Sequence, residues 1–183
     1  VSRLAQRGST RALFCNISPH ALLDPDFFPE FIAFMEQNTS LADKLIFEFS
    51  QSIVNQFGAF ELKSLATLTE NGFRFSLDKV EKLDLDFAGL HANGFRFIKV
   101  DAAILLDGMG EAGSPIHAAD FSDYLHRNGL ELIVERIEDE ATMNRLLPYS
   151  ISLGQGFLFS EPKPVRPEIF GQPRIAKRSE RAA

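Results

Sequence analysis

The sequence is poor in cysteine and in long apolar runs. Its one cysteine among 183 residues, Cys15, cannot form an internal disulfide, so the fold must rest on an apolar core and the expected compartment is a reducing one. No run approaches the ~18 apolar residues that a membrane-spanning helix needs, and no signal-peptide pattern opens the chain. These absences predict a soluble, cytoplasmic domain, which an anchor outside this chain could still tether.

An excess of positive charge is absent as well. The formal net charge at pH 7 is −6, and no basic stripe occurs before the last residues, which argues against general nucleic-acid binding. One small anionic ligand, held by local groups or by a metal, stays compatible with this balance. Residues 173–183 are basic and polar, and we interpret them as a flexible tail, with a basic docking segment as the alternative. Residues 1–172 then form one domain.

Short apolar, β-prone runs recur along this domain, and stretches with helical spacing lie between most of them. The helical stretches end in signals such as Asn71–Gly72, and one begins with the capping pair Ser114–Pro115. Strands that are apolar on both faces and alternate with helices predict a parallel sheet covered by helices, an α/β architecture. Strands are expected near 12–17, 45–50, 74–79, 95–100, 131–135 and 152–158, and helices near 27–35, 60–72 and 114–129.

Two parallel designs compete, an open doubly wound sheet and a TIM-like barrel. The first usually carries a glycine-rich phosphate loop after its first strand, and "CNISPH" at 15–20 contains no glycine. In a barrel, polar residues gather at the carboxyl ends of the strands, where the site is built. Each such residue alone could be a solvated strand end, but a set on successive strands predicts one shared site in a barrel. The set is Asn16, Glu48, Asp78, Lys99, Asp101 and Glu135.

Part of this set offers oxygen ligands to a metal. Asn16, Glu48 and Asp78 could supply oxygens to a hard cation such as Mg²⁺ or Mn²⁺, and there is no His/Cys cluster of the kind that zinc prefers. Lys79 follows Asp78 directly and adds a positive charge. We therefore expect a weak or vacant metal site without a tightly bound cofactor, and Mg or Mn only if the site is active.

The motifs around these residues resemble those of the EAL domain family, whose members hydrolyse or sense cyclic di-GMP. The resemblance runs from about residue 10 to residue 170. One matching motif alone is weak evidence, whereas six in order with suitable spacing predict a TIM-like barrel of the EAL type. The matches are "CNIS" for V-N-L-S, "FEFSQS" for E-L/I-T-E-S, "SLDKVEK" for L-D-D-F-G-T-G, "IKVD" for K-I-D, "VERIE" for A-E-G-V-E and "GQGFLFSEP" for V-Q-G-Y-x-F-S-x-P.

The resemblance also implies roles for the residues at the matching positions. Lys99, as the lysine that orients the attacking water, and Glu135 would be the catalytic pair. The implied metal ligands are Asn16, Glu48 and Asp78, and the implied nucleotide contacts are Ser50, Asp101, Glu135, Glu138, Gln155 and Pro162. Cyclic di-GMP is therefore the candidate ligand. Degenerate relatives of this family commonly act in the control of motility and biofilm formation.

Several departures from the family pattern fall on its catalytic apparatus. Lys79 stands in place of the second aspartate of the metal loop, and a positive charge there opposes a second cation. The loop after it, "VEKL", lacks the family's glycines and their backbone freedom. Gln51 replaces the glutamate that braces this loop, so a weaker brace is expected, and Arg136 replaces a glycine at the ligand mouth. The expected consequence is a loss of hydrolysis.

The family's first strand, with its E-A-L tripeptide and a nearby ligand-contacting arginine, has no counterpart in this sequence. The opening residues read instead as the helix that precedes the next strand. About six strands do not close an eight-stranded barrel, and ~200 residues or more are usual for that fold. We therefore expect an incomplete barrel in this chain, with two strands preceding Val1 in the natural protein.

Three functions stay open at this stage. The leading one is a catalytically inactive EAL-like domain that acts as a cyclic di-GMP receptor or regulatory scaffold, because the nucleotide contacts survive where the metal loop does not. The second is a protein-interaction domain that binds no nucleotide, which Arg136 at the mouth favours. The third is an active cyclic di-GMP phosphodiesterase. The protein partner is unknown, and a homodimer is one option because helical surfaces of this fold often pair.

Overall fold

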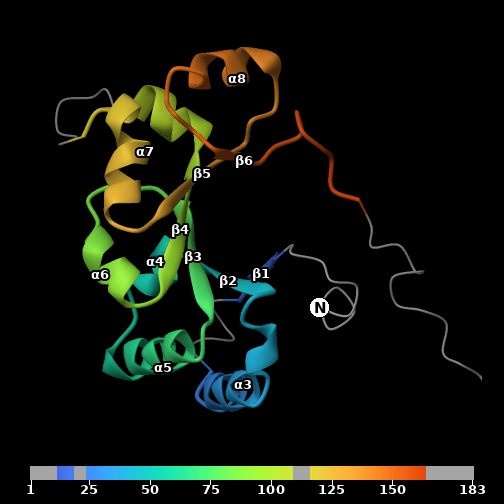
Figure 1. Cartoon of the computed structure of the whole chain (residues 1–183), viewed down its shortest axis with the longest axis vertical. Helices are drawn as coiled ribbons and strands as arrows, with labels where there is room; N and C mark the ends of the chain where they lie inside the picture. Colours follow the sequence, from blue (N-terminus) through green and yellow to red (C-terminus); the bar gives the residue numbers. More distant parts are fainter. Residues whose placement is uncertain (1–11, 19–23, 109–115, 164–183) are drawn as a thin grey trace, which may run out of the picture.

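In the computed structural model, the described residues are 12–18, 24–108 and 116–163. They contain one six-stranded sheet in which every pair of neighbouring strands is parallel and the strand order follows the sequence (Figure 1). This sheet confirms the predicted parallel α/β architecture. The strands are β1 (Leu13–Asn16), β2 (Leu45–Ser50), β3 (Arg74–Val80), β4 (Phe95–Asp101), β5 (Glu131–Glu135) and β6 (Leu153–Gly154).

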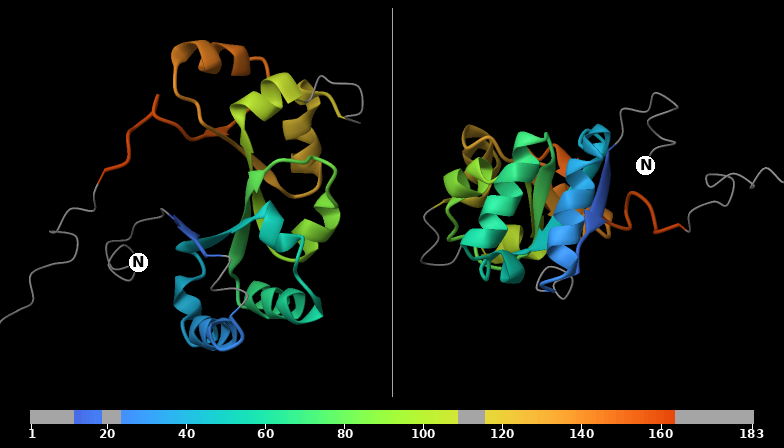
Figure 2. Two further views of the ribbon diagram at one scale, coloured as in Figure 1. Left: turned by 180° about the vertical axis from the view of Figure 1, so that it is seen from behind. Right: turned by 90° about the horizontal axis from the view of Figure 1, so that it is seen from below.

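Helices occupy the connections between the strands. Helices α5, α6 and α7 lie along the same side of the sheet (Figure 1), and Figure 2 shows this grouping from behind. None of the helices in the described part of the chain is long and apolar enough to cross a membrane. The helical elements are α3 (Phe27–Glu36), η1 (Thr39–Leu41), α4 (Gln51–Val54), α5 (Ala59–Glu70), α6 (Phe87–Ala92), the π-helical turn η2 (Ile104–Gly108), α7 (Ala118–Arg127) and α8 (Glu140–Leu146).

The helix ends follow local signals that the sequence carries. Helix α5 stops where predicted, and the chain reverses at Gly72, whose φ of 87° suits glycine. Helix α3 begins after Asp26, but the capping oxygen comes from Asp24, whose carboxylate accepts hydrogen bonds from the N–H groups of Asp26 and Phe27. The cap predicted at Ser114–Pro115 lies outside the described residues, and α7 itself starts at Ala118.

Phenylalanine fills the space between the sheet and its helices. The rings of Phe49, Phe75 and Phe95 pack edge to face with centroids 5.4 to 6.1 Å apart, and all three are fully buried. Burial of one such side chain stabilises the fold by roughly 1.5–3 kcal/mol. Neighbouring residues of a strand point to opposite faces of the sheet. Because Phe49 points into this core, its neighbour Glu48 points to the other face. The core therefore positions the polar residues.

The last strand is shorter than predicted. We expected a strand near 152–158, but β6 contains only Leu153 and Gly154. The next residues stay hydrogen-bonded to the segment after β5, because the Ile137 N–H donates to the Gln155 carbonyl. The chain then turns at Gly156, where a Cβ atom would lie 2.1 Å from the Ile137 carbonyl oxygen. This close approach of two backbones bends the segment out of the sheet.

Candidate functional site

A single ammonium group joins the carboxyl ends of four strands. Lys99 Nζ, from β4, lies 2.6 Å from Glu48 Oε1 on β2 and 3.0 Å from Glu135 Oε1 on β5. Asp78 Oδ1 on β3 is 4.0 Å away. The parallel register explains the meeting, since it sets Asp78 beside Ser50 and Asp101 beside Glu135 at the same edge of the sheet. The predicted convergence of strand-end residues thus places these four side chains in one cluster.

Burial and mutual attraction act against each other in this cluster. Burial by itself lowers the pKa of Lys99, but hydrogen bonds to Glu48 and Glu135 outweigh it and raise the pKa above its ordinary value. Burial raises the pKa of Glu135, and the nearby Asp78 carboxylate raises it further, although Lys99 partly offsets both effects. Lys99 is therefore protonated, and its positive charge is neutralised by the neighbouring carboxylates.

The cluster forms one wall of a cleft of about 800 Å³. Seven of the residues assigned to the site from the sequence lie in this lining, which supports their grouping. Those seven are Asn16, Glu48, Ser50, Asp78, Lys99, Glu135 and Gln155. The lining also includes Phe14, Ile17, Ser18 and Lys79.

Three of the predicted nucleotide contacts lie outside this lining. Asp101 faces Arg136, whose Nη1 is 3.1 Å from Asp101 Oδ2, while Asp101 Oδ1 accepts a hydrogen bond from the Ala103 N–H. Glu138 and Pro162 are exposed and do not line the cleft. The Arg136–Asp101 pair is itself accessible, because the arginine side chain is 76% exposed.

Phe14 is a cleft residue that the sequence interpretation missed. Its ring lies 5.6 Å from Lys99 Nζ and packs edge to face against Phe97 at 5.3 Å. A cation above an aromatic face is attracted by the ring's electrons. The available signal was strand alternation, because a residue two positions before Asn16 must share its face.

Gln51 holds the segment that follows β3. Its Oε1 accepts hydrogen bonds from the backbone N–H groups of Glu81 (2.8 Å) and Lys82 (3.1 Å), and its Nε2 donates to the Lys82 carbonyl oxygen at 2.7 Å. The expectation that Gln51 braces this loop poorly is therefore wrong. An amide offers both donor and acceptor groups, which match this backbone segment, whereas a carboxylate offers acceptors alone.

The carboxylates of the cluster converge on an ammonium group. Lys99 Nζ occupies the space between Glu48 and Glu135, and Lys79 places a second positive charge in the lining. Among the described residues, no three His, Cys, Asp or Glu side chains are placed to hold a metal ion together. In this arrangement the carboxylates of the cleft form an internal ion-pair cluster around Lys99.

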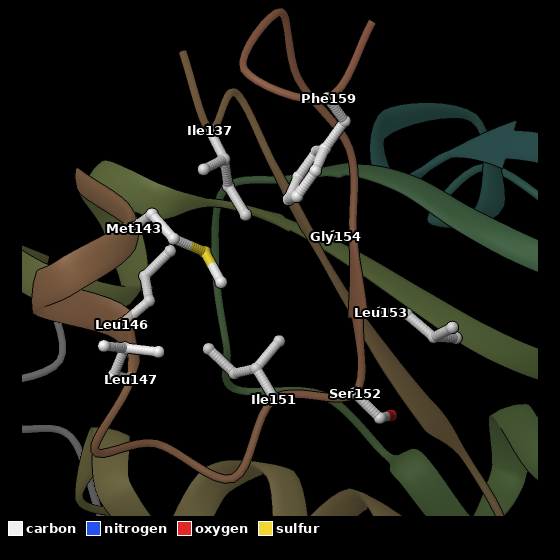
Figure 3. Close-up of a pocket in the computed structure, with 9 residues that line it drawn as sticks. All are labelled: Ile137, Met143, Leu146, Leu147, Ile151, Ser152, Leu153, Gly154 and Phe159. Carbon is white, nitrogen blue, oxygen red and sulfur yellow. The ribbon is translucent and has the colours of Figure 1, made fainter. Parts of the chain in front are cut away.

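A second, apolar pocket of about 390 Å³ lies between α8 and the segment around β6. Figure 3 shows Met143, Leu146 and Ile151 pointing into it, with Ile137 and Phe159 on the opposite rim. Leu147 and Phe159 on its border are 66% and 54% exposed. This pocket lacks the charged groups of the cleft, so the two hollows suit different kinds of ligand.

The comparisons with known proteins agree with this architecture. The probable cyclic di-GMP phosphodiesterase PdeI of Escherichia coli strain K12 is 27% identical over 170 residues, which are 87% of this chain and 21% of that protein. The apo structure of Vibrio cholerae LapD S helix-GGDEF-EAL is 18% identical with a TM-score of 0.69, over 87% of this chain and 39% of that one. The FimX EAL domain from Pseudomonas aeruginosa bound to c-di-GMP is 20% identical with a TM-score of 0.63, over 88% and 66%.

The chain thus spans about a fifth of the length of this curated relative. The structural likenesses confirm the predicted TIM-like barrel of the EAL type, present in the described residues as six parallel strands with helices outside. A family model described as the EAL domain matches residues 1–162, and the chain belongs to that family.

Proposed function

We propose that this protein is a catalytically inactive EAL domain that acts as a cyclic di-GMP receptor or regulatory scaffold in the control of motility or biofilm formation. Relatives whose names include cyclic di-GMP, among them PdeI and the FimX complex, support the ligand. The observation that supports the inactivity is Lys79, which stands at the position of the family's second metal-loop aspartate and places an ammonium group in the cleft lining. A positive charge at this position opposes a second metal cation.

The size and polarity of the cleft suit a nucleotide ligand. Its volume of about 800 Å³ falls in the range of small-molecule sites. Ser50, Asn16 and Gln155 supply neutral hydrogen-bonding groups around the charged wall. A polar ligand can therefore bind without displacing the buried ion pairs of Lys99.

Calorimetry with cyclic di-GMP, in Mg²⁺ and separately in EDTA, tests this proposal together with a chromatographic assay for hydrolysis. We expect saturable binding of similar affinity in both buffers and no linear product, with GMP as the control ligand for nucleotide recognition in general. Hydrolysis in Mg²⁺ or Mn²⁺ would identify an active phosphodiesterase and overturn the inactivity. Absence of binding in both buffers would overturn the receptor role.

A protein-interaction domain that binds no nucleotide is the second candidate. The ion pair between Arg136 and Asp101 favours it, because both oxygens of Asp101 already have partners. The apolar pocket bordered by Leu147 and Phe159 adds an accessible hydrophobic surface on the described part of the chain. This candidate predicts no heat with cyclic di-GMP under either condition.

A further inference from the structure

Lys79 enters the cleft through a break in strand alternation. Neighbouring residues of a regular strand point to opposite faces, yet Asp78 and Lys79 both line the cleft. The pairing of β3 with β4 shifts between Leu77 and Val80, and Lys79 has a left-handed backbone with φ of 51°. Irregularities of this kind re-aim side chains beside functional sites, and such conformations persist only where the surroundings fix them.

The two ammonium groups of the cleft are in different electrostatic states. Lys99 is 4% exposed and its charge is taken up by Glu48 and Glu135. Lys79 is exposed, and no carboxylate of the described residues forms an ion pair with it. Of the two cations in this lining, Lys79 is the one whose charge is available to a ligand.

The charge balance of the lining decides where an anion can bind. Three carboxylates and two ammonium groups leave the lining with one negative charge, so an anion beside Glu48 or Glu135 would be repelled. The Lys79 side of the cleft is the exception. Ser50, which pairs in register with Asp78, adds a hydroxyl donor near that side.

We propose that the Lys79 ammonium binds a phosphodiester group of the ligand directly, without a divalent cation between them. This inference rests on the proposed receptor function and names the group that would hold the phosphate. A protonated amine is a compact charge that interacts with phosphate in this manner. Binding should therefore persist when divalent ions are removed.

The test compares Lys79→Ala and Lys79→Arg with Lys82→Ala, a matched control that removes an exposed lysine three residues further along the chain and outside the cleft lining. Calorimetry with cyclic di-GMP is done in EDTA and in Mg²⁺. We expect Lys79→Ala to weaken binding about tenfold or more, since a hydrogen bond to a charged group commonly has this effect. Lys79→Arg should keep most of the affinity, and Lys82→Ala should change it less than about twofold.

Unchanged affinity in Lys79→Ala, or binding by the unmodified protein that requires Mg²⁺, would overturn the inference while leaving the receptor function intact. If cyclic di-GMP does not bind at all, the receptor function fails, and inorganic pyrophosphate then tests Lys79 separately. Pyrophosphate should shift the backbone amide NMR signal of Lys79 in the unmodified protein and in Lys82→Ala. The absence of that shift would overturn the inference as well.

Discussion

Lys99 Nζ lies 2.6 Å from Glu48 Oε1, and each side chain is only 5% exposed. This ion pair joins β2 to β4 across the intervening strand β3. Breaking a buried pair by removing one partner is strongly destabilising, because it leaves the other charge buried without compensation. This ion pair therefore helps to hold the cleft side of the sheet, whereas the opposite side is stabilised by the packed rings of Phe49, Phe75 and Phe95.

The stability of the fold should decrease at alkaline pH through Lys99. Because its folded-state pKa is raised, its contribution to the free energy of unfolding is complete below about pH 10.5 and is lost as the pH rises through the folded pKa. Lys99→Met should lower that free energy by about 3 kcal/mol at pH 8. Urea unfolding of both proteins across this range should show the difference shrinking above about pH 10.5. A difference that stays constant would contradict the raised pKa.

Replacing Gln51 by Glu should destabilise the loop after β3. At neutral pH the new carboxylate has no donor for the Lys82 carbonyl oxygen, which now receives a hydrogen bond from Nε2 at 2.7 Å. The loss of this hydrogen bond should lower the free energy of unfolding by about 1 kcal/mol. Urea unfolding compares Gln51→Glu with the unmodified protein, and the exposed Glu81→Gln is the control. An unfolding free energy equal to that of the unmodified protein would show that the amide donor is dispensable.

A glycine substitution tests the close contact between the segment that follows β6 and the segment that follows β5. Gly156→Ala places a Cβ atom 2.1 Å from the Ile137 carbonyl oxygen, so the two segments must separate. The expected loss of unfolding free energy is about 1–3 kcal/mol or more, as for other overpacked sites. Gly108→Ala is the control, because its nearest contact would be Ile104 Cγ2 at a comfortable 3.7 Å. Similar melting temperatures for the two variants would count against this steric account.

Arg136→Gly should separate the two leading functions. The glycine suits the left-handed backbone at this position, where Arg136 has φ of 57°, and it frees Asp101 Oδ2. If Asp101 contacts the nucleotide, the affinity for cyclic di-GMP should rise several-fold. Arg145→Ala, which breaks the exposed pair with Asp107, is the control and should leave the affinity unchanged. An unchanged affinity in Arg136→Gly as well would remove Asp101 from the set of ligand contacts.

The sequence predicted the sheet better than the details of the site, for physical reasons. Apolar runs and helical spacing report burial directly, and the register of parallel strands then brings Glu48, Lys99 and Glu135 together. Backbone irregularities, in contrast, do not produce a recognisable pattern in the sequence. The turn into the cleft at Lys79 depends on one φ angle and a shifted register, and the brace by Gln51 depends on hydrogen bonds to a distant backbone segment.

Lys79→Asp alone should not give hydrolysis of cyclic di-GMP, even with added Mn²⁺. The substitution returns a carboxylate to the cleft, but Lys99 remains bound between Glu48 and Glu135 and continues to take up their charge. The following segment, "VEKL", still lacks glycine and is still held by Gln51. Productive placement of a catalytic group requires about half an ångström of accuracy, set by the residues around it.

The measurement is chromatographic detection of the linear dinucleotide after long incubation at high protein concentration, with the unmodified protein alongside. Circular dichroism confirms that the variant is folded, so that absence of product reports on the site. Turnover by Lys79→Asp would mean that one charge at this position suppresses catalysis. The Lys99 ion pairs and the glycine-free loop would then be compatible with hydrolysis, and the inactivity would rest on Lys79 alone.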